Sequence, residues 1–336
     1  MPFAVESRNQ SGATGLDPRV FTLGDGAGGR ADVWPALGFN CFRWQAVVAG
    51  RTLDLLYADP NLFDDGRPTR SGIPILFPFP NRIRGGHFRW DGKDYHLPYT
   101  DTVLGNAIHG FACRRPWRVV NEGADANGAW LTGEFRHSVD AKDCAGLWPA
   151  DYTLRVTYRL GVNRLSVEAE VTNPDKVPLP FGLGYHPYYR LPFVPGVAPA
   201  DCTVSVPARS DWHLDRCLPT GPRDAVDAAR DLNPARRFSD LSVDDVLTDL
   251  PAVTPGADGL IERARLVGAP GTELRLFCAP DFREMVVFTP AHREAFCVEP
   301  YTCTTDAINL QQQGFDAGWR TLPPGGRWTS VFEMRV

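Results

Sequence analysis

The segment Leu165-Ser166-Val167-Glu168-Ala169-Glu170-Val171 alternates apolar and polar residues without a break. This period of two is what a β-strand with one buried and one solvated face requires. Eight further segments have strand character and are separated by clusters of Gly, Pro, Asn and Asp, which favour turns. They are Val20–Leu23, Leu53–Tyr57, Trp117–Asn121, Trp130–Arg136, Tyr152–Leu160, Glu273–Cys278, Met285–Thr289 and Trp328–Val336. The pattern predicts an antiparallel all-β protein.

Turn and helix signals around these strands agree with that class. Asp91-Gly92 stands between two short strand-like segments and tolerates the positive φ angles of a tight hairpin, so we expect a hairpin over residues 87–97. Helical character is confined to residues 223–241, where Pro234 allows at most one or two short helices. Residues 1–15 are polar and predict a loose N-terminal tail. No repeat or linker divides the rest, so residues 16–336 are expected to form one domain.

Composition limits the kinds of partner. The chain has 336 residues with 35 Lys plus Arg and 40 Asp plus Glu, a net charge of −5. No global positive field would attract nucleic acid or anionic lipid. The longest charge-free stretch, Val177–Tyr189, is too short to span a bilayer, and no secretory leader is evident at the N-terminus, so the expected location is the cytoplasm. The eight cysteines stand singly without a CxxC pair, which predicts reduced structural thiols and no metal site.

Four segments place a strongly polar residue in aromatic, turn-rich surroundings, as binding clefts often do. Their polar residues are Asn81 and Arg82, His109, His186, and Glu299. Each one alone has a structural explanation, such as an ion pair, a turn or an exposed side chain. Together, a guanidinium, two imidazoles and a carboxylate among Trp, Tyr and Phe suit a sugar, which offers hydroxyls and apolar ring faces.

The same segments resemble the aldose 1-epimerase (galactose mutarotase) family. The matching stretches run in the family's order from about Val20 to Val336: NRI at 81–83, NAIHG at 106–110, GLGYHPYY at 182–189, VEPYT at 298–302, DAIN at 306–309 and LPPGGRW at 322–328. The resemblance implies a single-domain antiparallel β-supersandwich, in which two large sheets are layered.

The resemblance also implies site roles. Glu299 becomes the general base and His186 the general acid, while Arg82, His109 and Asn81 bind substrate. A further substrate-binding aspartate is expected at Asp244, with the adjacent Asp245 as the other choice, because the local sequence departs from the family pattern.

The implied reaction interconverts the α and β anomers of a free hexose. The base takes the proton of the C1 hydroxyl while the acid protonates the ring oxygen, and both transfers reverse when the ring closes on the other face. No cofactor or metal is implied, and the expected partner is a small sugar.

Two alternatives remain open, as does the oligomeric state. A hexose-6-phosphate 1-epimerase would need basic residues near the distal end of the sugar, for which Arg114 and Arg115 are candidates. A non-catalytic carbohydrate-binding β-sandwich would use the aromatic cleft alone.

Overall fold

The computed structural model describes residues 2–336; strands make up nearly half of them and far outnumber the helical residues. The all-β prediction is therefore confirmed. Helices within these residues are short. The α-helices are α1 (Leu62–Asp65), α2 (His137–Asp140) and α3 (Ala307–Gln312). The single 3₁₀ turns are η1 (Pro68–Arg70), η2 (Arg84–Gly86), η3 (Ala112–Arg114), η4 (Lys142–Cys144), η5 (Pro199–Asp201) and η6 (Phe238–Asp240). No helix between residues 2 and 336 is long and apolar enough to cross a membrane.

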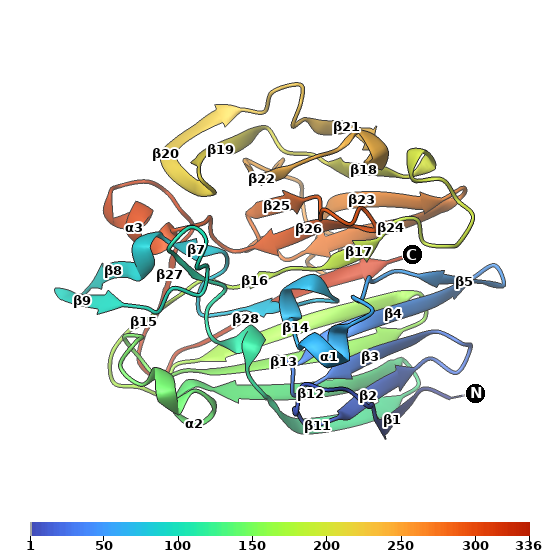
Figure 1. The fold of residues 1–336 in the computed structure, drawn as a ribbon, viewed down its shortest axis with the longest axis horizontal. Coiled ribbons are helices and arrows are strands. Elements are labelled where there is room, and N and C mark those ends of the chain that lie inside the picture. The colour runs from blue at the N-terminus through green and yellow to red at the C-terminus, as the bar shows by residue number, and fades with distance from the viewer. Residues whose placement is uncertain (1) are drawn as a thin grey trace.

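The largest sheet has nine antiparallel strands and extends through most of the molecule (Figure 1). In spatial order they are β11 (Arg118–Asp125), β12 (Gly128–Arg136), β13 (Thr153–Gly161), β14 (Arg164–Thr172), β28 (Arg327–Arg335), β24 (Thr272–Cys278), β23 (Ile261–Ala269), β18 (Thr203–Val206) and β21 (Leu232–Arg237). The alternating segment Leu165–Val171 lies in β14, near the middle of this sheet, and its apolar residues are fully buried.

A second antiparallel sheet packs against the first. Its strands are β20 (Leu218–Ala225), β19 (Ser210–Asp215), β22 (Asp244–Thr248), β25 (Glu284–Phe288), β26 (Ala295–Tyr301), β16 (Gly184–Tyr185) and β6 (Ile75–Leu76), with β17 (Tyr188–Arg190) also paired to β26. Tyr185 of β16 contacts Phe332 of β28 with ring centroids 5.4 Å apart, so a shared core joins the two sheets. This layering is the predicted supersandwich.

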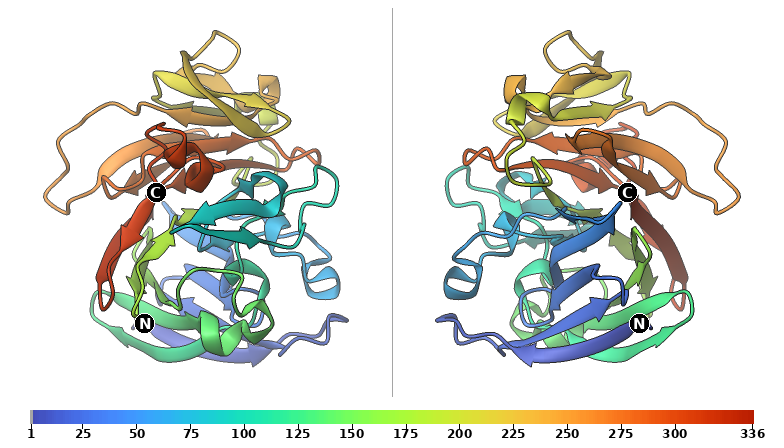
Figure 2. Two further views of the ribbon diagram at one scale, coloured as in Figure 1. Left: turned by 90° about the vertical axis from the view of Figure 1, so that its left-hand side faces the viewer. Right: turned by 90° about the vertical axis from the view of Figure 1, so that its right-hand side faces the viewer.

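The N-terminal strands form a third, five-stranded sheet beside β11 and β12 (Figures 1 and 2). Its members are β1 (Ala4–Asn9), β2 (Arg19–Gly24), β3 (Arg30–Trp34), β4 (Asn40–Val48) and β5 (Arg51–Asp54). Three two-stranded ladders complete the fold: β7 (Arg82–Ile83) with β10 (Ala107–Ile108), β8 (His87–Trp90) with β9 (Lys93–His96), and β15 (Leu179–Phe181) with β27 (Arg320–Leu322).

Two predictions from the sequence are wrong. Ala4–Asn9 is strand β1, paired along its whole length with β2, so these residues are no loose tail; Met1 of that tail lies outside the described residues. Arg8 contributes to this order, because its guanidinium pairs with the buried Asp32 at 3.1 Å. The segment 223–241 contains no α-helix and instead runs from the end of β20 through β21 to η6.

The predicted hairpin over residues 87–97 is confirmed, with φ of 47° at Asp91 and 76° at Gly92 between β8 and β9.

Candidate active site

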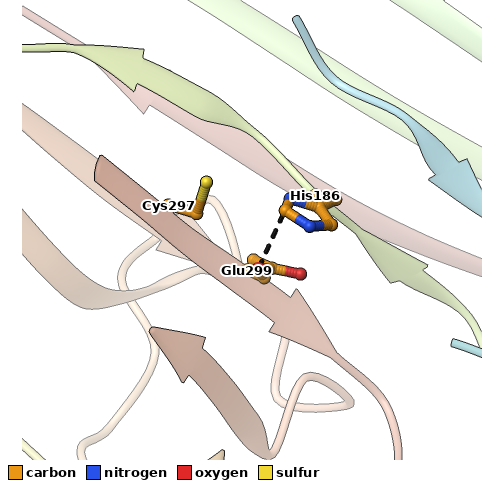
Figure 3. A group of neighbouring side chains, drawn as sticks. All are labelled: His186, Cys297 and Glu299. Carbon is orange, nitrogen blue, oxygen red and sulfur yellow. Dashed lines mark ion pairs between the residues drawn. The ribbon is translucent and has the colours of Figure 1, made fainter. Parts of the chain in front are cut away.

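One face of the second sheet gathers polar residues because of the strand register. Tyr301 pairs with Gly184 and Cys297 with Tyr188, so Glu299, between them on β26, lies level with His186. Side chains alternate across a strand, and the intervening residues of β26 face the core between the sheets. The register therefore points Glu299 and His186 into the same region on the outer face. Figure 3 shows these two side chains turned toward one another, with Cys297 beside them.

Two tyrosines hold the ends of this pair. His186 Nδ1 lies 3.3 Å from Glu299 Oε1. The Tyr301 hydroxyl donates to the other carboxylate oxygen, Oε2, at 2.6 Å. The Tyr188 hydroxyl donates to the carbonyl of Thr69 at 2.5 Å, and its oxygen lies 3.3 Å from His186 Nε2. Each catalytic candidate is thus fixed on the side that faces away from the other.

These contacts determine the tautomer of His186. Because the one proton of the Tyr188 hydroxyl is already donated to Thr69, His186 Nε2 must be the donor in the second contact. In neutral His186, Nδ1 is then a bare acceptor that faces a carboxylate oxygen. Two bare acceptors repel, so we infer that one of the two groups carries a proton, although the 3.3 Å approach does not have hydrogen-bond geometry. Nδ1 makes no hydrogen bond among the described residues and so remains open to a ligand.

Burial controls the charge of this pair. It lowers the pKa of His186 to about 3, with a smaller contribution from the positive charge of Arg82. Burial also raises the pKa of Glu299 well above its ordinary value, although the hydrogen bond from Tyr301 opposes the change. Both directions favour a neutral imidazole beside a protonated carboxyl. This neutral pair carries the same number of protons as the ion pair, so a proton shift between the two groups interconverts them.

Asn81 just before β7, Arg82 at its start and His109 just after β10 form one edge of the site. Asn81 and His109 both have positive φ, 51° and 67°, and the His109 amide donates to the Asn81 carbonyl at 2.8 Å. Arg82 donates through Nε to Asp101 at 2.7 Å and through Nη1 to the Asn81 side chain at 3.0 Å. Left-handed backbone at two non-glycine residues is costly and is held in place here by these bonds. The guanidinium is therefore fixed in one orientation.

His109 lies next to His186 at this edge. The two imidazole rings meet edge to face with centroids 5.7 Å apart. Burial, together with the charges of His186 and Arg82, lowers the pKa of His109 well below its ordinary value. His109 is therefore neutral at physiological pH, and its Nδ1 has no partner among the described residues. It offers one donor and one acceptor to a bound molecule.

The structure separates the two aspartates that the sequence left open. Asp244 of β22 pairs with Phe288 of β25, whose own partner on β26 is Cys297, so its exposed side chain belongs to the face that carries Glu299. Desolvation raises the pKa of Asp244, and the charge of Arg82 opposes this shift. Asp245 instead forms an ion pair with Arg230 at 3.1 Å. Asp244 is the aspartate placed toward the site.

The predicted residues Asn81, Arg82, His109, His186, Asp244 and Glu299 therefore lie around one region. Arg115 is engaged elsewhere, because it forms a bidentate pair with Asp143 at 2.7 and 2.6 Å. Arg114 is exposed and has no ion pair within residues 2–336.

Sequence reasoning did not assign roles to the residues that hold the site together. Tyr301 and Tyr188 each follow their catalytic candidate by two residues, and alternation along a strand is a signal that could have found Tyr301. Asp101 lies in a loop 19 residues beyond Arg82, and no local pattern indicates that the two meet.

Comparison with known proteins identifies the family of this chain. The family model described as aldose 1-epimerase matches residues 50–335. The chain belongs to the aldose 1-epimerase family. Two curated Escherichia coli (strain K12) relatives, both named as uncharacterized proteins, are YihR, 33% identical over 115 residues, and YphB, 31% identical over 116. Each match covers 34% of this chain and only 34% or 36% of the relative's own length.

Solved structures share the fold of the present chain over nearly its whole length. A galactose mutarotase-like protein from Clostridium acetobutylicum has a TM-score of 0.87 and 21% identity, covering 99% of this chain and 98% of the other. A galactose 1-epimerase from Lactobacillus acidophilus has a TM-score of 0.75 and 17% identity, with the same coverage. At these identities the likeness establishes the fold.

Proposed function

We propose that this protein is a mutarotase that interconverts the α and β anomers of a free hexose. Family membership and fold support a sugar epimerase of this kind. The observation that carries the proposal is the 3.3 Å pair of Glu299 and His186, each supported from behind by a tyrosine. A carboxyl and an imidazole at this separation can both reach oxygens bonded to a single carbon.

The chemistry requires one proton to leave the C1 hydroxyl and one to reach the ring oxygen. Glu299 as carboxylate accepts the first proton, and His186 as imidazolium donates the second, which breaks the bond between C1 and the ring oxygen. Rotation about C1–C2 turns the other face of the aldehyde to the ring hydroxyl. Reclosure returns both protons, so Glu299 and His186 end in the state in which they began.

The proton content of the pair fits this cycle. The reactive form, carboxylate with imidazolium, differs from the neutral form favoured by burial only by one proton moved across the 3.3 Å contact. No exchange with solvent is needed to reach it. The Tyr301 hydroxyl stabilises the carboxylate in this form, and Tyr188 accepts from the imidazolium.

The surrounding residues are suited to hold sugar hydroxyls. Arg82 is oriented by Asp101 and Asn81, which leaves Nη2 for a ligand. Neutral His109 and the exposed carboxylate of Asp244 add donors and acceptors. Since Asp101 lies 2.7 Å from Arg82 and Asp143 neutralises Arg115, both of these cations are compensated. Arg114, the other basic candidate, is exposed and has no ion pair within residues 2–336, so a hexose 6-phosphate stays the alternative substrate that the assay has to compare.

The test is polarimetry on freshly dissolved single anomers. We expect the protein to accelerate the decay of optical rotation for at least one of glucose, galactose and xylose more than for a hexose 6-phosphate, with or without EDTA. Faster turnover of the phosphorylated sugar would replace the substrate proposed here. Sugar binding without acceleration of any anomer would identify a carbohydrate-binding module instead.

A further inference from the structure

Cys297 lies beside the proposed catalytic pair and has no part in the proposed reaction. Its Sγ, a ring nitrogen of His186 and a carboxylate oxygen of Glu299 all lie within 4.8 Å of one another (Figure 3). The position of Cys297 follows from the strand register, because Cys297 precedes Glu299 by two residues and pairs with Tyr188. The site face thus brings one nitrogen, one sulfur and one oxygen donor close together.

We propose that these three residues form a binding site for a thiophilic divalent cation such as Zn²⁺, and that the ion inhibits the enzyme. In tetrahedral Zn²⁺ sites, bonds of about 2.0–2.3 Å put neighbouring ligand atoms roughly 3.3–3.7 Å apart. His186 Nδ1 and Glu299 Oε1 are already 3.3 Å apart. The widest separation in the cluster, at most 4.8 Å, has to close by only about 1 Å.

An unsatisfied atom supports this site independently. His186 Nδ1 is buried and makes no hydrogen bond in the described part of the chain, while Nε2 is committed to Tyr188. Metal-bound imidazoles typically use one ring nitrogen for the ion and the other for such a partner. Tyr301 supports Glu299 in the same way. The site therefore has both donors and the surrounding groups that orient them.

The donor set also selects the metal. Imidazole and thiolate suit Zn²⁺ and Cu²⁺, whereas Mg²⁺ and Ca²⁺ prefer oxygen ligands. Binding converts the Cys297 thiol to a thiolate and takes the one shared proton from the Glu299 and His186 pair, so two protons leave to solvent. A thiolate and a carboxylate then balance the two positive charges of the ion. Apparent affinity should rise with pH by up to about tenfold per unit for each proton released.

Inhibition follows because the ion occupies both proton-transfer groups, and this part rests on the proposed function. Metal binding itself does not depend on the proposed function, because it can be measured without any sugar. Co²⁺ serves as the probe, since its bond to a thiolate gives a charge-transfer band in the near ultraviolet and tetrahedral Co²⁺ absorbs strongly in the visible.

Two serine variants form a matched pair. Among residues 2–336, Cys217 is the only cysteine that is not buried, and its Sγ lies 3.9 Å from Asp244, so it is the main rival as a metal ligand near the site. We expect Cys297→Ser to abolish the thiolate band and to weaken Zn²⁺ inhibition by about 100-fold or more, with basal mutarotation retained. Cys217→Ser should change neither. Circular dichroism and the thermal midpoint establish that both variants fold.

The outcomes separate the two proposals. A Co²⁺ thiolate band that persists in Cys297→Ser, or no Co²⁺ or Zn²⁺ binding by the parent, would overturn the metal site and leave the mutarotase proposal intact. A band that depends on Cys297 in a protein with no mutarotase activity would retain the site and reject the function. Zn²⁺ inhibition that does not compete with sugar would contradict the assignment of His186 and Glu299 as ligands.

Discussion

The hydrogen bond from Tyr301 to Glu299 allows the protonation of the catalytic pair to be tested. Tyr301→Phe removes a hydroxyl that donates to Glu299 Oε2 at 2.6 Å in a buried environment and leaves the ring in place. The bond stabilises the carboxylate form, so its loss raises the pKa of Glu299 further. The pair then shifts more strongly toward the neutral form.

The size of the effect follows from the bond. A hydrogen bond to a charged group contributes about 1.5–3 kcal/mol, which at 1.4 kcal/mol per decade is roughly 10–100-fold. In this pair the carboxyl of Glu299 holds its proton more tightly than the imidazole of His186 does. The reactive form, carboxylate with imidazolium, is therefore the less populated one. Its population therefore falls by about that factor at pH values where the pair keeps one proton. The alkaline limb of the profile moves to higher pH, because it reports loss of the proton from Glu299.

The assay is kcat/KM for mutarotation from about pH 5 to 10 by polarimetry. We expect a bell-shaped profile for the parent. In Tyr301→Phe, kcat/KM should be roughly 10–100-fold lower than in the parent on the plateau and should approach the parent value on the alkaline side. Tyr185→Phe is the control, because the Tyr185 hydroxyl lies in the core and has no partner among residues 2–336. A loss of equal size at every pH, or no loss, would refute the neutral pair.

Three further predictions test the proton relay, a buried carboxyl and a strained turn. Glu299→Gln and His186→Asn should each lower kcat by about 10²–10⁴-fold, and the double variant should lose less than the product of the two losses, measured by polarimetry; full additivity would indicate that the groups act independently. Glu284 is fully buried, and burial raises its pKa from 4.5 to about 7. The stabilising contribution of the protonated carboxyl is complete below about pH 4.5 and is lost as pH rises through 7. Between pH 5 and 9, the free energy of unfolding measured with urea should therefore fall by of order 3 kcal/mol more in the parent than in Glu284→Gln; parallel pH curves for the two proteins would contradict this. Gly110→Ala would place Cβ 2.1 Å from the carbonyl oxygen of Phe77 at a φ of 64°, whereas Gly105→Ala meets open space at a φ of 71°. We expect the first to lower the free energy of unfolding by more than about 2 kcal/mol and the second by about 1; equal losses would show that the close approach to Phe77 is unimportant.

Alternation and turn chemistry predict much of this fold. All nine predicted strand segments overlap strands of the structure, because an alternating segment such as Leu165–Val171 buries one face regardless of its partners. The tail prediction failed because strand β1 has mostly exposed side chains and is held by its ladder with β2 and by the Arg8 to Asp32 ion pair. Long-range pairing of this kind leaves no local pattern in the sequence.

The helix prediction failed for a related reason. The segment 223–241 has residues that favour helices, but pairing of β21 with β18 overrides that preference. At the site, the motifs identified the main polar residues, whereas Asp101, which orients Arg82, could be found only from the structure. The choice between Asp244 and Asp245 likewise depends on the register of β22.

The central claim is that Glu299 and His186 exchange protons with a sugar at C1 and the ring oxygen. It is tested most directly by the decay of optical rotation of one pure anomer, for whichever sugar the parent turns over, with the parent, Glu299→Gln and Glu284→Gln compared at equal concentration. Glu284 is a second buried glutamate, on the neighbouring strand β25, and hydrogen-bonds to Trp212. We predict that Glu284→Gln retains the parent rate and that Glu299→Gln falls by at least about 100-fold. A Glu299→Gln variant that stays within about threefold of the parent would contradict the claim.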